Sequence, residues 1–373
     1  MLKPIPVNEP LLDGNEKQYL MNCIETGWIS SEGPYVQAFE EKFAARLGRR
    51  HAIAVSSGSA AIDATIDALS IGPGDEVILP TFTIISCVAE IVRRGAIPVL
   101  IDADTYTWNM NVNLIEEKIT SRTKAIMAVH IYGLPVDMDP VLEIAKKYNL
   151  FVIEDAAEMH GQKYNDIPCG KFGDVSIFSF YSNKHVTTGE GGMVLTDDDN
   201  LAESLRGLRN LCFNSEKRFI HERIGWNLRM TNMQAAIGLA QLERLDEFTI
   251  RKREMGRLYS ELLGDLDQVQ LPIKKTIYSE NIYWVYGMLI KQNSKLNVSQ
   301  IMAELSENKI GTRPFFYPIH QQPVLIKRGY FKSVSLPISE NLYKQGFYIP
   351  SGMSLQRDDI IRVAETLRKI ILS

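Results

Sequence analysis

Short apolar runs rich in valine and isoleucine alternate with longer segments of helical periodicity between about residue 50 and residue 200. Runs that are apolar throughout, with helix-length segments between them, indicate a mostly parallel sheet covered by helices on both faces. Such a sheet binds its ligands at the carboxyl ends of its strands. The expected strands lie at 51–55, 72–80 (after an initial turn), 96–102, 124–133, 149–155, 175–180 and 192–196.

A long helical pattern over 230–263 divides this region from the rest of the chain. After it, an apolar run at 283–290 and helical patterns at 299–308 and 357–371 predict a smaller α+β unit. Single cores tend to divide beyond roughly 250–300 residues, and this chain has 373. We therefore expect a large domain over 1–245 that binds the ligand and a small C-terminal domain over 246–373 that covers it.

Composition and charge exclude several classes of protein. A net charge of −4 and a pI of about 6.0 give no general attraction to nucleic acid or to an anionic membrane. The first residues lack the pattern of a signal peptide, and no run reaches the ~20 apolar residues of a membrane helix. Cys23, Cys87, Cys169 and Cys212 are far apart and have no metal-ligand spacing, so we expect free thiols in the cytoplasm and no metal site.

The segment SFYSNKHVTTGEGGMVLT (179–196) places Lys184 on a loop directly after an expected strand. A lone loop lysine is usually just solvated. Here Ser179 precedes it and the glycine-rich TTGEGG (187–192) follows, and such residues let donors approach an anion closely. A phosphate beside a lysine is what a pyridoxal 5'-phosphate site requires, because the lysine forms a Schiff base and the phosphate anchors the ring.

Two further segments complete this interpretation. Asp155 ends an expected buried strand in VIEDAAEMHG (152–161). It can cap the next helix, or it can sit beside the pyridinium nitrogen and keep that nitrogen protonated. Glu158 is expected to turn back toward the ring. In VSSGSAAI (55–62) a strand leads into a helix, and its N-terminal amides and hydroxyls form a phosphate seat. The residues expected there are Ser57, Gly58 and Ser59.

Taken together and in this order, the segments SGSAA, EDAAE, SFYSNK–TTGEGG, GWNLRMTNMQAAIG and RPFFYPIH resemble the DegT/DnrJ/EryC1/StrS sugar aminotransferases over nearly the whole chain. The resemblance implies the fold type I, aspartate-aminotransferase-like α/β architecture, with a three-layer α/β/α large domain and a small α+β domain. It also implies a homodimer with active sites at the subunit boundary. Lys184 matches the lysine that carries the cofactor, where related dehydratases have histidine.

By the same resemblance, Asp155 is the partner of the ring nitrogen. Gly58, Ser59 and Ser179 hold the phosphate, and Asn227 reaches it from the neighbouring subunit. One position departs from the family pattern, because Ile84 follows PTFT where an aromatic residue usually stacks on the ring. Aliphatic contact, or another residue such as Phe82, is then expected to replace that stacking.

The expected reaction is transfer of an amino group from L-glutamate to carbon 4 of a nucleotide-linked 4-keto-6-deoxysugar, with GDP as the nucleotide that the resemblance favours. A UDP- or dTDP-linked sugar, reaction at carbon 3, and a non-catalytic regulator with the family fold remain alternatives. Some residues are candidates for substrate contact, although packing or solvation explains them as well. These are Trp28, Ser30, Ser31, His185, Arg229, Arg313 and His320.

Overall fold

The computed structural model describes residues 3–213, 219–291 and 293–373. Its core is a seven-stranded sheet in the order β1-β9-β8-β5-β4-β2-β3. All neighbouring pairs are parallel except those of β9, which runs antiparallel to β1 and to β8. The strands are β1 (His51–Val55), β2 (Glu76–Pro80), β3 (Ile97–Ile101), β4 (Thr123–Val129), β5 (Phe151–Asp155), β8 (Val175–Ser179) and β9 (Gly192–Thr196).

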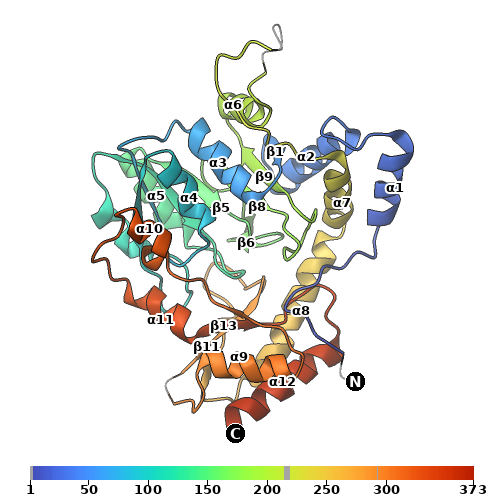
Figure 1. Cartoon of the computed structure of the whole chain (residues 1–373), viewed down its shortest axis with the longest axis vertical. Coiled ribbons are helices and arrows are strands. Elements are labelled where there is room, and N and C mark those ends of the chain that lie inside the picture. The colour runs from blue at the N-terminus through green and yellow to red at the C-terminus, as the bar shows by residue number, and fades with distance from the viewer. Residues whose placement is uncertain (1–2, 214–218, 292) are drawn as a thin grey trace.

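Helices cover both faces of this sheet, which confirms the predicted three-layer architecture (Figure 1). One face packs against α3 (Gly58–Ala68), α4 (Ser86–Arg93) and α6 (Asp199–Arg209). The other packs against α2 (Pro34–Leu47), α5 (Met138–Tyr148) and α7 (Asn232–Leu242). Helix α1 (Glu16–Thr26) lies against α7. A small hairpin, β6 (Lys163–Tyr164) and β7 (Ile167–Pro168), and the short helices η1 (Val112–Leu114) and η2 (Glu116–Lys118) lie in the connections.

The smaller, C-terminal part of the fold contains a second sheet, which is antiparallel and has the strand order β10-β11-β13-β12. Its strands are β10 (Val269–Gln270), β11 (Tyr286–Ile290), β13 (Gly346–Ile349) and β12 (Arg313–Pro314). A separate apolar cluster joins β11 and β13 to helices α8, α9 and α12. The remaining helices are α8 (Leu245–Leu263), α9 (Val298–Glu307), η3 (Ile319–Gln321), α10 (Pro323–Lys327), α11 (Pro337–Gln345) and α12 (Arg357–Leu372).

Helix α8 connects the two parts, because Leu245 packs in the large part whereas Tyr259 and Leu263 pack in the small one. The single helical pattern expected over 230–263 is two helices, α7 and α8, interrupted at 243–244. The first residues also differ from the expected grouping. Ile5 pairs with Ile310 and is buried in the small cluster, so the N-terminal segment packs with the second part of the chain. None of the described helices is long and apolar enough to cross a membrane.

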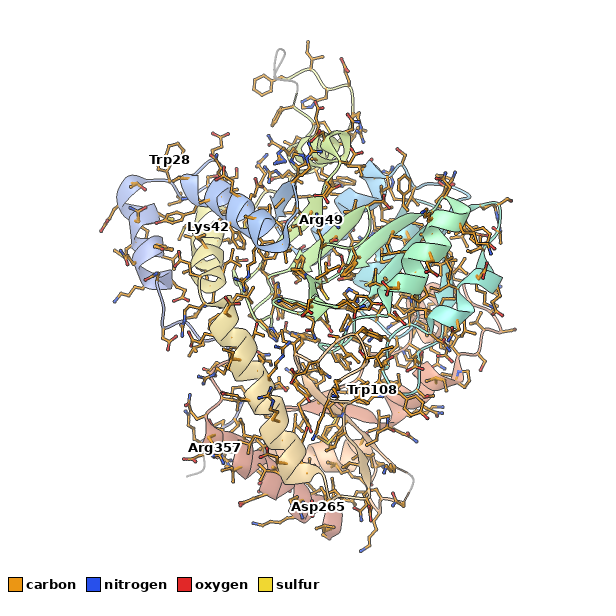
Figure 2. All side chains as sticks on the ribbon, turned by 180° about the vertical axis from the view of Figure 1, so that it is seen from behind. Trp28, Lys42, Arg49, Trp108, Asp265 and Arg357 are labelled. Carbon is orange, nitrogen blue, oxygen red and sulfur yellow. The ribbon has the colours of Figure 1, made fainter. Side chains whose placement is uncertain are left out.

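One buried arginine ties the loop before β8 to the edge of the sheet (Figure 2). Arg49 lies between α2 and β1, and its guanidinium donates to the carbonyls of Gly170, Phe172 and Gly173 at 2.8, 2.6 and 3.0 Å. It also pairs with Asp197 at 3.1 Å. Buried carbonyls without a donor are costly, so this side chain fixes the loop that leads into β8, the strand that ends at Ser179 just before the Lys184 loop.

Replacement of Arg49 tests this role. We expect Arg49→Met to lower the free energy of unfolding by about 3 kcal/mol, because the Gly170 and Gly173 carbonyls lose the donor that Arg49 supplies and Asp197 loses an ion pair. The neighbouring Arg50 is exposed and pairs with exposed Asp199 at 2.7 Å, so Arg50→Met is expected to change it by less than about 1 kcal/mol. Urea denaturation of both variants measures the difference. Equal losses would contradict the assignment.

Candidate active site

A cavity of about 400 Å³ lies where the strands of the large sheet end. Residues that end or follow β1, β2, β4, β5 and β8 all line it, as expected for a sheet whose parallel strands share one carboxyl edge. Among them are eight of the nine residues predicted to hold the cofactor: Ser57, Gly58, Ser59, Ile84, Asp155, Glu158, Ser179 and Lys184.

Lys184 lies in the loop after β8, in a turn closed by its own N–H, which donates to the Tyr181 carbonyl at 2.9 Å. Its Nζ is 3.9 Å from Oε1 of Glu158 and 3.9 Å from the centre of the Trp284 ring. Burial lowers the pKa of Lys184, and Glu158 and Asp155 oppose that shift. A buried amine with a lowered pKa more readily supplies the neutral form that attacks an aldehyde.

Asp155 closes β5 and is buried beneath the cavity. Its Oδ1 accepts from the Ala157 N–H at 3.1 Å, and its Oδ2 accepts from the Cys87 thiol at 3.3 Å. Burial raises the pKa of Asp155, whereas these two donors and the Lys184 charge lower it. The carboxyl group is therefore held in one orientation by weak partners, and it is suited to accept a hydrogen bond from a ring N–H.

A backbone N–H group in the loop after β4 holds Glu158 in place. Its Oε2 accepts from the Tyr132 N–H at 2.6 Å, and Tyr132 has a positive φ of 56°. Bulky residues rarely adopt this conformation, and here it turns the N–H toward the carboxylate. Burial raises the pKa of Glu158 to about 8, against the attraction of Lys184.

The residues predicted to hold the phosphate lie together at the N-terminus of α3 and the end of β8. Ser57 is the N-cap, and its hydroxyl accepts from the Ala60 N–H at 3.1 Å. A Cβ on Gly58 would lie 2.8 Å from Cβ of Ser179, and a Cβ on Gly192 would lie 2.3 Å from the Ser57 carbonyl oxygen. The glycines thus bring hydroxyls and free amides together at a positive helix end. This cradle beside a buried lysine and a buried carboxylate fits pyridoxal phosphate.

Asn227 does not line this cavity, and neither do the candidate substrate residues. Asn227 pairs with the backbone of Asn210. Trp28, Ser30, Ser31 and Arg229 instead line a second hollow of about 800 Å³, with Arg206 and Arg209. Figure 2 labels Trp28 at the outer surface of the molecule.

The two predicted substrate histidines are enclosed by protein. Nδ1 of His320 bonds Oγ1 of Thr81 at 2.8 Å and its Nε2 bonds Glu340 at 3.2 Å, so both ring nitrogens already have partners. His185 is buried behind the lysine loop, where its Nδ1 bonds the His160 carbonyl at 3.2 Å. Arg313 is exposed on β12. Within one chain, none of the three lies on the cavity wall.

The structure adds lining residues that the sequence pattern did not identify. Three aromatic side chains form a wall opposite the sheet, and they all come from the second half of the chain. Phe316 lies in the RPFFYPIH segment, but neither that segment nor the surroundings of Trp284 and Tyr348 indicate by themselves that these rings face the cavity. The added residues that matter most here are Tyr181, Asn183, Trp284, Phe316 and Tyr348.

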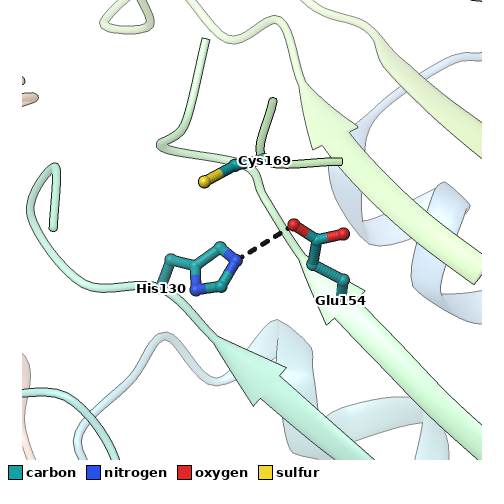
Figure 3. A group of neighbouring side chains, drawn as sticks. All are labelled: His130, Glu154 and Cys169. Atoms are coloured by element: carbon teal, nitrogen blue, oxygen red, sulfur yellow. Dashed lines mark hydrogen bonds and ion pairs between the residues drawn. The ribbon is translucent and has the colours of Figure 1, made fainter. Parts of the chain in front are cut away.

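Beneath the cavity, three buried side chains have the spacing of metal ligands (Figure 3). Nε2 of His130 bonds Oε1 of Glu154 at 3.1 Å, and Nδ1 of His130 accepts from the Val136 N–H at 3.0 Å. Glu154 also accepts from Ser176 at 2.8 Å, and Cys169 is the third member. The imidazole and carboxylate are thus already hydrogen-bonded, and they link β4 and β5 next to Asp155.

Comparison with known proteins places this geometry in a family. The model of the DegT/DnrJ/EryC1/StrS aminotransferase family matches residues 10–368. The chain is 43% identical to a GDP-perosamine synthase of Escherichia coli O157:H7, over 99% of each chain. It is 40% identical to one of Caulobacter vibrioides, over 100% of this chain and 99% of the relative.

A crystal structure of DesV from S. venezuelae superposes with a TM-score of 0.89 and 31% identity, over 96% of this chain and 95% of that one. The family depends on pyridoxal phosphate, as the lysine, carboxylate and phosphate seat predict. The match covers both parts of the fold and the whole of the described cavity. The chain therefore belongs to the DegT/DnrJ/EryC1/StrS aminotransferase family.

Proposed function

We propose that this protein transfers an amino group from L-glutamate to carbon 4 of GDP-4-keto-6-deoxy-D-mannose, giving GDP-perosamine, with pyridoxal 5'-phosphate held at Lys184. The single observation that carries the chemistry is the buried Lys184 amine beside Glu158 and above Asp155 at the sheet edge. The identity of about 40% to GDP-perosamine synthases over full length supports the choice of sugar.

Each residue has a distinct role in this proposal. When bound, pyridoxal phosphate supplies an aldehyde for the amino group and a ring that withdraws electrons from the reacting carbon. Asp155 holds a proton at the ring nitrogen, and the Lys184 amine moves a proton at the reacting carbon as general base and acid. Ser57, Gly58, Ser59 and Ser179 bind the phosphate at the end of α3.

The remaining contacts orient the reactants. Glu158 lies close enough to Lys184 to limit where the amine rests. Ile84 would cover the ring with aliphatic contact, and its place on the cavity wall supports this role. The aromatic wall of Trp284, Phe316 and Tyr348 keeps water away from the reacting atoms, and this strengthens the electrostatic contacts among the charged groups.

We further propose that the protein is a homodimer, in which Asn227 reaches the phosphate in the partner's site. The position of Asn227 outside its own cavity supports this arrangement. Trp28, Ser30, Ser31 and Arg229 lie together in the second hollow, so they would enter the partner's site as one group. Arg229 and Arg313 then have the charge to meet the substrate diphosphate.

The role of Lys184 is tested by Lys184→Ala. We expect amino transfer to fall on the order of 10⁴-fold or more, because one residue both holds the cofactor covalently and moves the proton. Lys147→Ala is the control, since Lys147 is exposed and pairs with Glu116 at the surface. Chromatography of the sugar product measures both rates. Full activity in Lys184→Ala would refute the assignment.

The substrate is tested with a panel of GDP-, UDP- and dTDP-linked 4-keto-6-deoxysugars, each incubated with L-glutamate. We expect amination of GDP-4-keto-6-deoxy-D-mannose only, seen by mass spectrometry, and NMR of the product to place nitrogen on carbon 4. Turnover confined to a UDP- or dTDP-sugar would overturn the proposed sugar while leaving the aminotransferase chemistry in place.

The shared site is tested by mixing two inactive variants. Lys184→Ala lacks the amine, and Asn227→Asp places a negative charge against the phosphate. In a mixed dimer with shared sites, one site has both native residues, so we expect activity to return when the two variants are unfolded and refolded together. Each variant refolded alone is the control. Absence of rescue, with mixed dimers present by mass spectrometry, would show that Asn227 acts elsewhere.

A further inference from the structure

Trp284 touches the lysine of the active site although it lies a hundred residues further along the chain. It precedes β11 in the small part, and its side chain is buried. The Lys184 Nζ lies over the indole ring, 3.9 Å from its centre. The indole Nε1 donates to the carbonyl of Asn183, the residue before the lysine, at 2.9 Å. One side chain therefore contacts both the backbone and the amine of the lysine loop.

Other contacts fix the orientation of this indole. The Trp284 carbonyl accepts from Nζ of buried Lys252 on α8 at 2.9 Å. The ring packs against Tyr132, with 6.0 Å between ring centres. On the other side of the hydrogen bond, the Asn183 carbonyl also accepts from Nδ2 of Asn8 at 3.2 Å. Lys252 thus holds the backbone of Trp284, and Asn8 shares with the indole the Asn183 carbonyl of the lysine loop.

The charges of the groups around the Lys184 amine indicate what the Trp284 ring contributes. Glu158, Asp155 and the Cys87 thiol on α4 lie close enough to act on the charge of the amine, and the thiol donates to Asp155. His160 and His185 are buried nearby, and burial holds their pKa values low, so they carry no charge at neutral pH. The ring face of tryptophan is negative and attracts an ammonium group strongly where water is excluded.

We propose that Trp284 is a positioning residue that holds the free, protonated Lys184 amine between its indole face and the Glu158 carboxyl group. This inference rests on the proposed function, in which the lysine is free of the cofactor for part of each cycle. A flexible lysine side chain with no such contact would lose its place at the reacting carbon. Trp284 thus keeps the amine within reach for proton transfer.

The test follows the pH dependence of cofactor attachment. Attachment forms a carbon–nitrogen double bond with the aldehyde and releases water, and it requires an amine that has lost its extra proton. Apoenzyme is mixed with pyridoxal phosphate between about pH 6 and pH 10, and the absorbance of the attached cofactor gives the rate. In Trp284→Leu the ammonium loses the ring face, so we expect the midpoint of this profile to fall by about one pH unit.

Trp284→Phe is the matched control, because it keeps an aromatic face but loses the Nε1 donor to Asn183. We expect its midpoint to stay close to that of the unaltered protein. An unchanged midpoint in Trp284→Leu would overturn the proposal. Equal shifts in both variants would also overturn it, because the hydrogen bond rather than the ring face would then set the profile.

Two further measurements distinguish a failure of the proposed function from a failure of the role proposed for Trp284. Borohydride reduction and mass spectrometry of the unaltered protein locate the attachment, and a site other than Lys184 would refute the proposed function itself. If Trp284→Leu does not fold, the chain is produced with fluorinated tryptophan, which weakens the ring face without changing its shape. Trp284 is the tryptophan over Lys184, so the midpoint should fall with fluorination. A constant midpoint would refute the role of Trp284.

Discussion

The structure depends on keeping one amine and two carboxyl groups close together and away from water. Burial disfavours the charged form of each group, while their mutual attraction favours it. For Lys184, Asp155 and Glu158 burial dominates, because the pKa of the amine is lowered and those of the carboxyl groups are raised. The groups therefore exchange protons easily, which suits a reaction that moves protons between carbon and nitrogen.

A different part of the structure holds each of these three groups in place. Asp155 is fixed at the end of β5, Glu158 is fixed by the strained backbone at Tyr132, and Lys184 is fixed by its turn and by Trp284. Asp155 and Glu158 are held by residues of the large part, whereas Trp284 is bonded through its carbonyl to Lys252 on α8, the helix that connects the two parts. Tyr348 on β13 of the small part also lines the cavity, so both parts of the fold contribute to it.

The sequence predicted the large sheet well, because buried strands must be apolar throughout. The runs at 51–55, 149–155 and 192–196 correspond to β1, β5 and β9. The lysine, the carboxylate and the glycine-rich turn were found for the same reason, since their chemistry requires fixed residue types next to those strands. The wall of Trp284, Phe316 and Tyr348 was not identified, although Phe316 lies in RPFFYPIH, because long-range packing brings these rings together and no local pattern shows that they face one cavity. A single chain does not show the site of a residue that is expected to act across a subunit boundary, such as Asn227.

The antiparallel course of β9 has a consequence for the choice of reactive carbon. Because β9 returns directly beside β8, both ends of the lysine loop are anchored to adjacent strands, and the Phe180 N–H donates to the Gly191 carbonyl at 2.8 Å across its base. This bond and the strand pairing close the loop at its base, so the lysine side chain extends from an anchored stretch of backbone. In the proposed reaction, the distance to which the cavity walls admit the sugar ring would therefore contribute to which of its carbons reaches the amine.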